Sequence, residues 1–359
     1  MNPRTMNYQI VATLGPATDE QQMWGSLVAA GATAFRLNTA HFRLDILQNW
    51  LEAIAHFLAE SPAGNDRFPE RAASVDADAF PVILDLQASK WRIGNVKSTA
   101  LESGASVQLV LETEGDEQGD RSGSDPGILP IPHPDLFTAA QIDAGGEIAV
   151  NDGKVMLRIE SPGKRRITAR VTRGGEISAR KGISLVGSEY RVEHLHRNDM
   201  QVLEMARRYP FVRYALSYVK DGVEMSSYRR LFQERGAGAS YLIAKVERAS
   251  ALEDAEQIAG NADELWICRG DLGAEVGAAA MAEKLYRFLP RIRRIPKPVF
   301  LAGQVLEHLT SHPTPTRSEI SYLYEALQRG FAGVVLSDET AVGAYPLESC
   351  RVAALFRSG

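Results

Sequence analysis

The sequence has few of the features that mark secreted, membrane-embedded or nucleic-acid-binding proteins. Of its 359 residues only two are cysteine, Cys268 and Cys350, which excludes a disulfide framework and is typical of a reducing compartment. No apolar run is long enough to cross a bilayer, and the first residues lack a basic segment followed by an apolar stretch. A net charge of −5 argues against a nucleic-acid or anionic-membrane surface. We therefore expect a cytoplasmic protein with a small-molecule partner, and no nucleic-acid or membrane binding.

Motifs for several common chemistries are missing as well. The seven histidines show no metal-ligand spacing, and no strand–loop–helix segment carries the Gly-Lys-Ser/Thr of a phosphate-binding loop. Cys268 has no evident His or Asp partner that would activate it, so a small buried thiol is favoured over a nucleophile. The chemistry must therefore come from other side chains.

Short apolar runs alternate with amphipathic segments along most of the chain. Such runs are typical of strands buried in a parallel sheet. The expected strands are Ile10–Leu14, Ala34–Leu37, Val82–Asp85, Tyr214–Tyr218, Tyr241–Ala244, Leu265–Cys268, Val299–Ala302 and Gly333–Leu336. The clearest helical stripe consists of Leu44, Leu47, Leu51, Ile54 and Leu58. Alternating strands and helices in this number predict an α/β fold, a TIM-type (β/α)₈ barrel.

Between the third and fourth expected strands the pattern changes. Val155, Leu157 and Ile159 alternate with Met156, Arg158 and Glu160, and apolar and polar residues alternate again in 167–171, which is typical of half-buried antiparallel strands. The span Thr113–Gly127, rich in Gly, Asp and Glu, predicts a surface loop. We expect a barrel domain of residues 1–87 and 185–359. Residues 88–184 would form an inserted all-β lid domain over the strand ends.

Polar side chains lie at the end of each expected strand or just after it, where a barrel places its active site. They are Thr13, Arg36, Asn38, His41, Asp85, Ser217, Lys220, Lys245, Glu247, Arg269, Asp271, Gln304, Ser337 and Glu339. Glu247 and Asp271, from adjacent strands, offer oxygen ligands to Mg²⁺ or Mn²⁺. Lys245 lies two residues before Glu247 and points to the same side if the chain stays extended. The alternative, a surface Lys–Glu pair, is disfavoured by this position, so the pattern predicts an anionic substrate bridged by a metal.

Nine segments resemble those of the pyruvate kinase family, in the family's order and across nearly the whole chain. They are IVATLGPAT, GATAFRLNTAH, AKVER, CRGDLGAEVG, KPVFLAGQVLEHL, HPTPTRSE and VVLSDETAVGAYPLE, with IAVNDGKVMLRI and RKGISLVG in the insertion. Any one segment would be weak evidence for the family, but the complete set in the same order is specific for it. The resemblance implies reversible phosphoryl transfer between phosphoenolpyruvate and ADP, yielding pyruvate and ATP, as in glycolysis.

The same resemblance implies roles for individual residues. Lys245 would neutralise the transferred phosphoryl group and the enolate oxygen, and Arg36 would grip the phosphate. Glu247 and Asp271 would hold Mg²⁺ or Mn²⁺, and backbone N–H groups around Gly270 and Asp271 would receive the substrate carboxylate. The residues implied to face the nucleotide are Pro16, Asn38, His41, Arg92 and Lys181.

The chain departs from the family pattern in the substrate loop. Gly303, in the expected substrate site, stands where the family has threonine, so a hydroxyl implicated in substrate contact and enolate protonation is missing. Losing an acid–base group commonly costs roughly 10²–10⁴ in rate. Either Ser217, a neighbouring hydroxyl or water takes its place, or the chain does not protonate an enolate.

The family's potassium site is altered too. Asn38 and Asp85 remain as a remnant of this monovalent-cation site, whereas Ala40 and Leu86 replace its hydroxyl ligands. Lys90 stands where a glutamate is common, so its ammonium is a candidate substitute for K⁺, with drift at a loop position as the alternative. The resemblance to the potassium-independent branch of the family implies activity without K⁺.

Three functions remain open. The first is a phosphotransferase that uses phosphoenolpyruvate. The others are a lyase or aldolase of the same fold acting on an oxo acid, and a ligand-binding paralogue with little turnover. The match ends near Gly359, which predicts that the family's C-terminal regulatory domain, and allosteric control through it, are absent. A homodimer through the barrel stays compatible with the resemblance.

Overall fold

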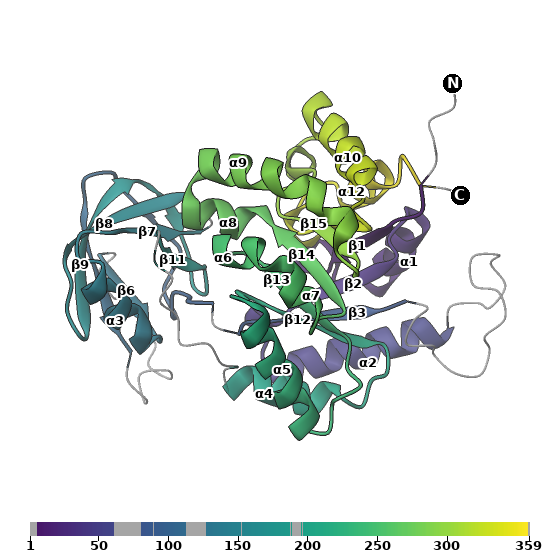
Figure 1. Ribbon diagram of the computed structural model, residues 1–359, viewed down its shortest axis with the longest axis horizontal. Coiled ribbons are helices and arrows are strands. Elements are labelled where there is room, and N and C mark those ends of the chain that lie inside the picture. The colour runs from purple at the N-terminus through teal and green to yellow at the C-terminus, as the bar shows by residue number, and fades with distance from the viewer. Residues whose placement is uncertain are drawn as a thin grey trace. The chain divides into compact units, whose positions relative to one another are not determined.

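The computed structural model describes residues 6–60, 80–88, 90–112, 127–151, 153–186, 188, 195 and 197–357. The chain divides into two compact units, whose elements are labelled in Figure 1. The first consists of Met1–Ala88, Leu195–Arg269 and Tyr286–Gly359, and the second of Ser89–His194 and Gly270–Leu285. No helix within the described ranges is both long enough and apolar enough to cross a membrane.

The first unit is built around a closed barrel of eight parallel strands. Their order around the barrel is β1, β2, β3, β12, β13, β14, β15 and β16, and β16 pairs with β1 to close it. Their bounds are β1 Gln9–Thr13, β2 Ala34–Asn38, β3 Val82–Leu86, β12 Val212–Leu216, β13 Leu242–Val246, β14 Glu264–Cys268, β15 Val299–Ala302 and β16 Gly333–Leu336. Each expected strand overlaps one of these, which confirms the predicted (β/α)₈ barrel.

Side chains fill the interior of the barrel. They come from alternate positions of the strands and are Val11, Ala34, Ile83, Ala215, Ile243, Trp266, Cys268, Phe300, Ala302 and Val335. Gly333 leaves room for the Phe300 ring, because a Cβ atom at residue 333 would lie 2.3 Å from it. The interior is therefore a packed core, and chemistry is restricted to the strand ends.

Helices follow the strands of the barrel. They are α1 Gln21–Ala29, α2 Leu44–Glu60, α4 Arg197–Ala206, α5 Gly222–Glu234, α6 Ala249–Glu253, α7 Ala255–Ala259, α8 Arg269–Val276, α9 Ala278–Phe288, α10 Arg317–Arg329, α11 Asp338–Ala341 and α12 Pro346–Ala353. Short 3₁₀ turns span η1 Pro16–Thr18, η2 Thr39–His41, η4 Leu289–Arg294 and η5 Glu307–Thr310. The predicted stripe of α2 is confirmed, since Leu47, Leu51 and Ile54 are buried.

The second unit is mainly a β-structure. Its six-stranded sheet has the order β11, β7, β8, β9, β5 and β6, and β4 pairs with β10 in a separate two-stranded sheet. The bounds are β4 Thr99–Leu101, β5 Ser106–Leu111, β6 Ile128–Ile131, β7 Glu147–Val150, β8 Val155–Ser161, β9 Arg166–Arg173, β10 Gly175–Ile177 and β11 Ile183–Leu185. The antiparallel pairing of β8 with β9 confirms the predicted alternation.

The sequence predicted an all-β insertion, but the insertion is not purely β. It contains helix α3, Pro134–Ile142, and β5 pairs with β6 in parallel. Proline starts α3, because its missing N–H and fixed φ suit a first helical turn, and Leu136 and Phe137 of α3 are buried. The predicted surface loop Thr113–Gly127 lies outside the described residues, except for Gly127.

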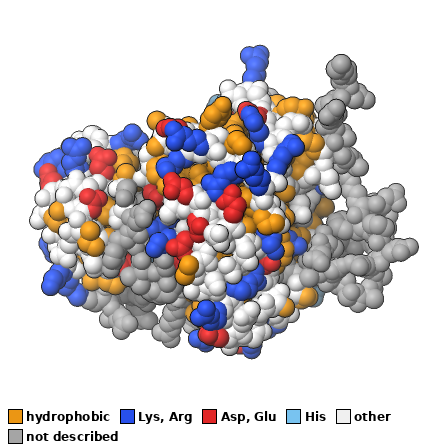
Figure 2. Space-filling view, in the orientation of Figure 1, with side chains coloured by type: hydrophobic (Ala, Val, Ile, Leu, Met, Phe, Trp, Pro, Cys, Tyr) orange, Lys and Arg blue, Asp and Glu red, His pale blue; other side chains and the backbone are white. Residues whose placement is uncertain are grey.

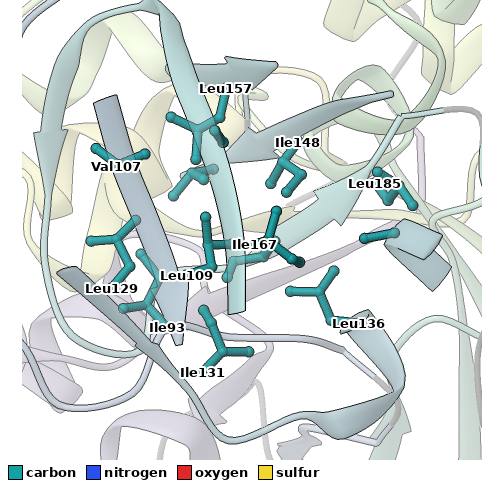
Figure 3. Packing of buried hydrophobic residues seen from close by; sticks show 14 of the residues in the cluster. Ile93, Val107, Leu109, Leu129, Ile131, Leu136, Ile148, Leu157, Ile167 and Leu185 are labelled. Carbon is teal, nitrogen blue, oxygen red and sulfur yellow. The ribbon is translucent and has the colours of Figure 1, made fainter. Parts of the chain in front are cut away.

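The second unit has a hydrophobic core of its own. Figure 3 shows side chains from its sheet directed into a common interior, among them Leu109 of β5, Leu157 of β8 and Ile167 of β9. Leu136 reaches the same core from α3. Burying each such side chain contributes roughly 1.5–3 kcal/mol, so this core holds the unit together independently of the barrel's interior.

The second unit also contains residues 270–285, where Asp271 forms an ion pair with Lys90. The predicted division into a barrel domain of residues 1–87 and 185–359 and an insertion stays a prediction. The limits of residues 88 and 184 for the insertion, and its action as a lid, stay predictions.

The surface carries charges of both signs. Figure 2 shows lysine, arginine and acidic side chains interspersed with hydrophobic ones on the displayed face. The large hydrophobic side chains that are exposed come from seven positions spread along the described chain, namely Ile46, Ile142, Val223, Tyr286, Tyr324, Val342 and Leu355. On this face, charges of one sign are not gathered into a continuous patch of the kind that binds a nucleic acid.

One carboxyl group, that of Glu264, is buried at the N-terminal end of β14. Trp266 Nε1–H donates to one of its oxygens, and the Tyr241 hydroxyl donates to the other at 3.1 Å. Burial raises the pKa of Glu264 from 4.5 to about 7, although the Trp266 hydrogen bond and the charge of Arg213 act in the opposite direction. Folded Glu264 therefore holds its proton more tightly than the unfolded chain does.

We expect the pH dependence of stability to report this group. The proton held by Glu264 contributes stability that is fully present below pH 4.5 and is lost as the pH rises through about 7. In the wild type the free energy of unfolding should fall by an amount on the order of 3 kcal/mol across that range, and Glu264→Gln should abolish this decrease. Denaturant unfolding at several pH values measures it, with Glu234→Gln on the exposed side of α5 as the control. An unchanged slope in Glu264→Gln contradicts the prediction.

Candidate active site

A cluster of charged side chains lies at the C-terminal ends of β2, β3 and β13 in the first unit. Lys245 is at its centre: Nζ lies 2.8 Å from Oε1 of Glu247 and 3.1 Å from Oδ2 of Asp85. The same ammonium donates a hydrogen bond to Ser217 Oγ at 3.1 Å. Lys245 and Glu247 meet as expected for residues two apart in an extended chain. The ammonium is thus held between two carboxylates.

Arg36 of β2 binds the same carboxylate from the other side. Its Nε and Nη2 groups donate to Asp85 Oδ2 at 2.8 and 2.6 Å, and Nη1 donates to Thr13 Oγ1 at 2.9 Å. Ser217 Oγ lies 3.1 Å from the second oxygen of Asp85, Oδ1. Asp85 therefore anchors both cations that the sequence assigned to the substrate.

Glu247 is fully buried and held by the backbone. Its Oε2 accepts a hydrogen bond from the N–H of Tyr218 at 2.7 Å, while Oε1 contacts Lys245. Tyr218 has a φ of 60°, a left-handed conformation that few large side chains adopt. A strained residue just after β12 thus aims its N–H at the carboxylate.

The electrostatics of the cluster keep Asp85, Lys245 and Arg36 charged. Burial alone would raise the pKa of Asp85, but Lys245 and Arg36 lower it well below its usual range. Burial would lower the pKa of Lys245, yet Asp85 and Glu247 raise it above that of a free lysine. The pKa of Arg36 is raised as well, because Asp85 outweighs the effect of burial. Lys245 is consequently a permanent cation across the physiological range.

In the second unit, Asp271 is bound by a lysine. Lys90 Nζ lies 2.6 Å from Asp271 Oδ1, and both side chains are largely buried. Asp271 lies in the first turn of α8, next to Gly270. A Cβ atom added at Gly270 would have no other atom within 4 Å, so the space beside this backbone is open. Of the two residues predicted to bind a metal, Glu247 belongs to the first unit and Asp271 to the second.

The other predicted residues make contacts within their own unit. Arg92 Nη1 donates to the carbonyl of Arg180 at 2.8 Å, and the carbonyl of Lys181 accepts from Ile93 N–H at 2.9 Å. Pro16 begins η1 and is exposed, and His41 ends η2 and is exposed. Within the described contacts Asn38 accepts from the N–H of Ala40 at 3.3 Å and lies beside Asp85 in the β2–β3 register. Their part in nucleotide binding stays a prediction.

The loop that contains Gly303 is held by an arginine. Arg269 Nε and Nη2 donate to the Gly303 carbonyl at 3.0 and 2.7 Å, and Nη2 also donates to the Gln304 carbonyl at 2.7 Å. Its guanidinium lies over the Tyr322 ring, 5.0 Å from the centroid. Gly303 and Gln304 are both left-handed, with φ of 81° and 53°. The glycine is thus required by the shape of the loop.

Sequence reasoning missed two features of this cluster. It treated Asp85 as one of the polar residues at the strand ends and as the remnant of a cation site, whereas the structure makes it the shared partner of Arg36 and Lys245. The available signal was a carboxylate at the end of β3, next to the strand that carries Arg36. It also missed Arg269 as the residue that holds the Gly303 loop, and nothing in the local pattern indicated that contact.

Carboxylates and cations at the ends of parallel barrel strands define the class of protein. Among the described residues no group of three or more His, Cys, Asp or Glu side chains forms a self-contained metal site. A metal here would need ligands from the substrate and water as well, as Mg²⁺ commonly does. The fold and the cluster define a (β/α)₈-barrel enzyme suited to an anionic small molecule.

Comparison with known proteins places the chain in a family. The family model described as "Pyruvate kinase, barrel domain" matches residues 5–350. The chain is similar to the pyruvate kinase of Agrobacterium vitis, with 33% identity over 96% of this chain and 66% of that protein. It is 32% identical to the pyruvate kinase of Methylorubrum extorquens, over 96% of this chain and 67% of that protein. The chain belongs to the pyruvate kinase family and spans about two thirds of the length of these relatives.

The left-handed loop predicts a cost for introducing the family's threonine. Gly303→Thr should lower the free energy of unfolding by roughly 1–3 kcal/mol, because a branched side chain is strained at a φ of 81°. Gly303→Ala should lose most of the same amount, since the strain arises from Cβ. Gly273→Ala in α8 is the matched control, with only ordinary contacts around its new methyl. Denaturant unfolding measures all three, and an unchanged Gly303→Thr would contradict the expected strain.

Proposed function

We propose that the chain transfers a phosphoryl group from phosphoenolpyruvate to ADP. The phosphorus–oxygen bond to the enol breaks, a new bond forms to the β-phosphate of ADP, and the enolate takes a proton to become pyruvate. Family membership supports this reaction. The observation that carries it is the permanently charged Lys245, held between Asp85 and Glu247 at the strand ends.

Lys245 and Arg36 are the proposed catalytic residues. Their positions are set before substrate arrives, because Asp85 holds both side chains. A preorganised cation aimed at developing negative charge is worth on the order of 3 kcal/mol where water is excluded. In the proposed reaction Lys245 neutralises the transferred group and the enolate oxygen, and Arg36 binds the phosphate by its forked guanidinium.

Glu247 and Asp271 are the proposed ligands of Mg²⁺ or Mn²⁺. Two carboxylates fit such an ion, which takes its remaining oxygens from substrate and water. Asp271 already attracts a cation in this structure, since the Lys90 ammonium occupies Oδ1. When bound, the metal would supply positive charge that stabilises the negative charge of the substrate. The N–H groups of Gly270 and Asp271 would receive that carboxylate, because α8 begins there.

Pro16, Asn38, His41, Arg92 and Lys181 are the residues proposed to bind the nucleotide. The second unit would act as a lid that excludes water during transfer. The proposed setting is the cytoplasm, where the reaction is a step of glycolysis.

Enolate protonation needs a group other than residue 303. Among the substitutes, Ser217 has a supporting contact, since its Oγ lies 3.1 Å from Lys245 Nζ. The missing threonine also favours a second candidate, a lyase or aldolase that forms an enolate from an oxo acid and needs no nucleotide. Because Gly303 has a left-handed backbone, the change from threonine concerns the conformation of the loop as well as the side chain.

Pyruvate formation from phosphoenolpyruvate, ADP and Mg²⁺ or Mn²⁺ tests the proposal. Lys245→Met should lower kcat/KM by at least about 10²-fold, because one preorganised charge is removed. Lys164→Met, a change at an exposed position of the second unit, is the control and should retain activity. A wild-type chain that forms no pyruvate but cleaves an oxo acid would replace the kinase proposal with the lyase.

The reaction should not require potassium. The remnant site offers Asn38 and Asp85, and Asp85 is already engaged by Arg36 and Lys245, so little is left for a monovalent ion. Lys90 is the proposed substitute charge. Initial rates in buffers with only sodium and only potassium should agree. Strong activation by potassium would show that the ion is still used.

A further inference from the structure

The ion pair between Lys90 and Asp271 is the starting observation. The two charged atoms are 2.6 Å apart, and the side chains are only 9% and 14% exposed. Breaking such a pair leaves a carboxylate short of its partner in a poorly solvated place, which costs more than breaking a surface pair. The contact joins residues 181 positions apart in the chain, so the fold itself imposes it.

Gly182 provides the space through which Lys90 reaches Asp271. A Cβ atom at residue 182 would lie 2.7 Å from Lys90 Cε and 3.3 Å from Nζ. Gly182 does not have a positive φ, so the glycine serves space rather than backbone conformation. An isolated bridge between Arg92 and Gly182 fixes this backbone beside the lysine. The path of the Lys90 side chain is therefore built into the second unit.

We infer that Lys90 competes with the divalent metal for the Asp271 carboxylate and thereby sets how tightly the chain binds Mg²⁺ or Mn²⁺. The inference rests on the proposed role of Asp271 as a metal ligand. An ammonium at hydrogen-bond distance from Oδ1 takes a position that a metal ion also needs, and the two like charges repel. The apparent affinity for metal equals the intrinsic affinity multiplied by the fraction of chains in which Lys90 does not hold Asp271.

Binding of Mn²⁺ to the full-length, metal-free chain, measured by calorimetry and by the paramagnetic resonance of free Mn²⁺, tests the inference without catalysis. Lys90→Met removes the competing charge and should lower Kd about tenfold, or about 1.4 kcal/mol. Gly182→Ala keeps the charge but pushes Lys90 Cε aside, and should lower Kd by a smaller factor. Lys90→Arg, which keeps a cation, and Lys97→Met, at an exposed position of the same unit, should match wild type.

The outcomes separate this inference from the proposed function. If wild type binds Mn²⁺, Asp271→Asn abolishes binding, and neither Lys90→Met nor Gly182→Ala binds more tightly, the competition is wrong and the metal site stands. Binding by Lys90→Met alone, with none by wild type, supports the competition. If no variant binds Mn²⁺ although circular dichroism shows each to be folded, both the competition and the metal site are wrong.

Discussion

The arrangement at the strand ends depends on the carboxylate of Asp85. Its Oδ2 atom receives two hydrogen bonds from Arg36 and lies 3.1 Å from the ammonium of Lys245. Without this anion two buried like charges would repel one another, and each would bear a desolvation cost of several kcal/mol. With Glu247 the cluster contains two cations and two carboxylates. It gains net positive charge only when a further cation arrives, which suits an anionic substrate that binds together with a metal.

The packed barrel explains why this cluster can be held so firmly. Large side chains such as Trp266 and Phe300 fill the interior, so the strands cannot shift to relieve the charges above them. The same rigidity extends to the loop after β15. Arg269 holds the carbonyls of Gly303 and Gln304, and both residues adopt left-handed backbones that suit the glycine. The absence of the family's threonine is thus one part of a loop whose whole conformation is specified.

Much of the fold follows from local patterns. Each barrel strand begins as a short apolar run, and the buried face of α2 follows from Leu47, Leu51 and Ile54 at helical spacing. Helix α3 was missed because its apolar residues lie in a stretch where alternation dominates the neighbouring segments. The parallel pairing of β5 with β6 was missed because register between strands is not written in either strand alone.

The sequence by itself determined which charges the protein carries, on which strand ends they sit, and the barrel that supports them. Hydrophobic periodicity is a property of neighbouring residues, so it survives in the one-dimensional chain. Only the tertiary structure decided the partners of those charges: Arg36 and Lys245 on Asp85, and Lys90 on Asp271. A long, flexible side chain can reach any carboxylate that folding brings within a few ångströms, and the Coulomb energy depends on that distance and not on separation along the chain.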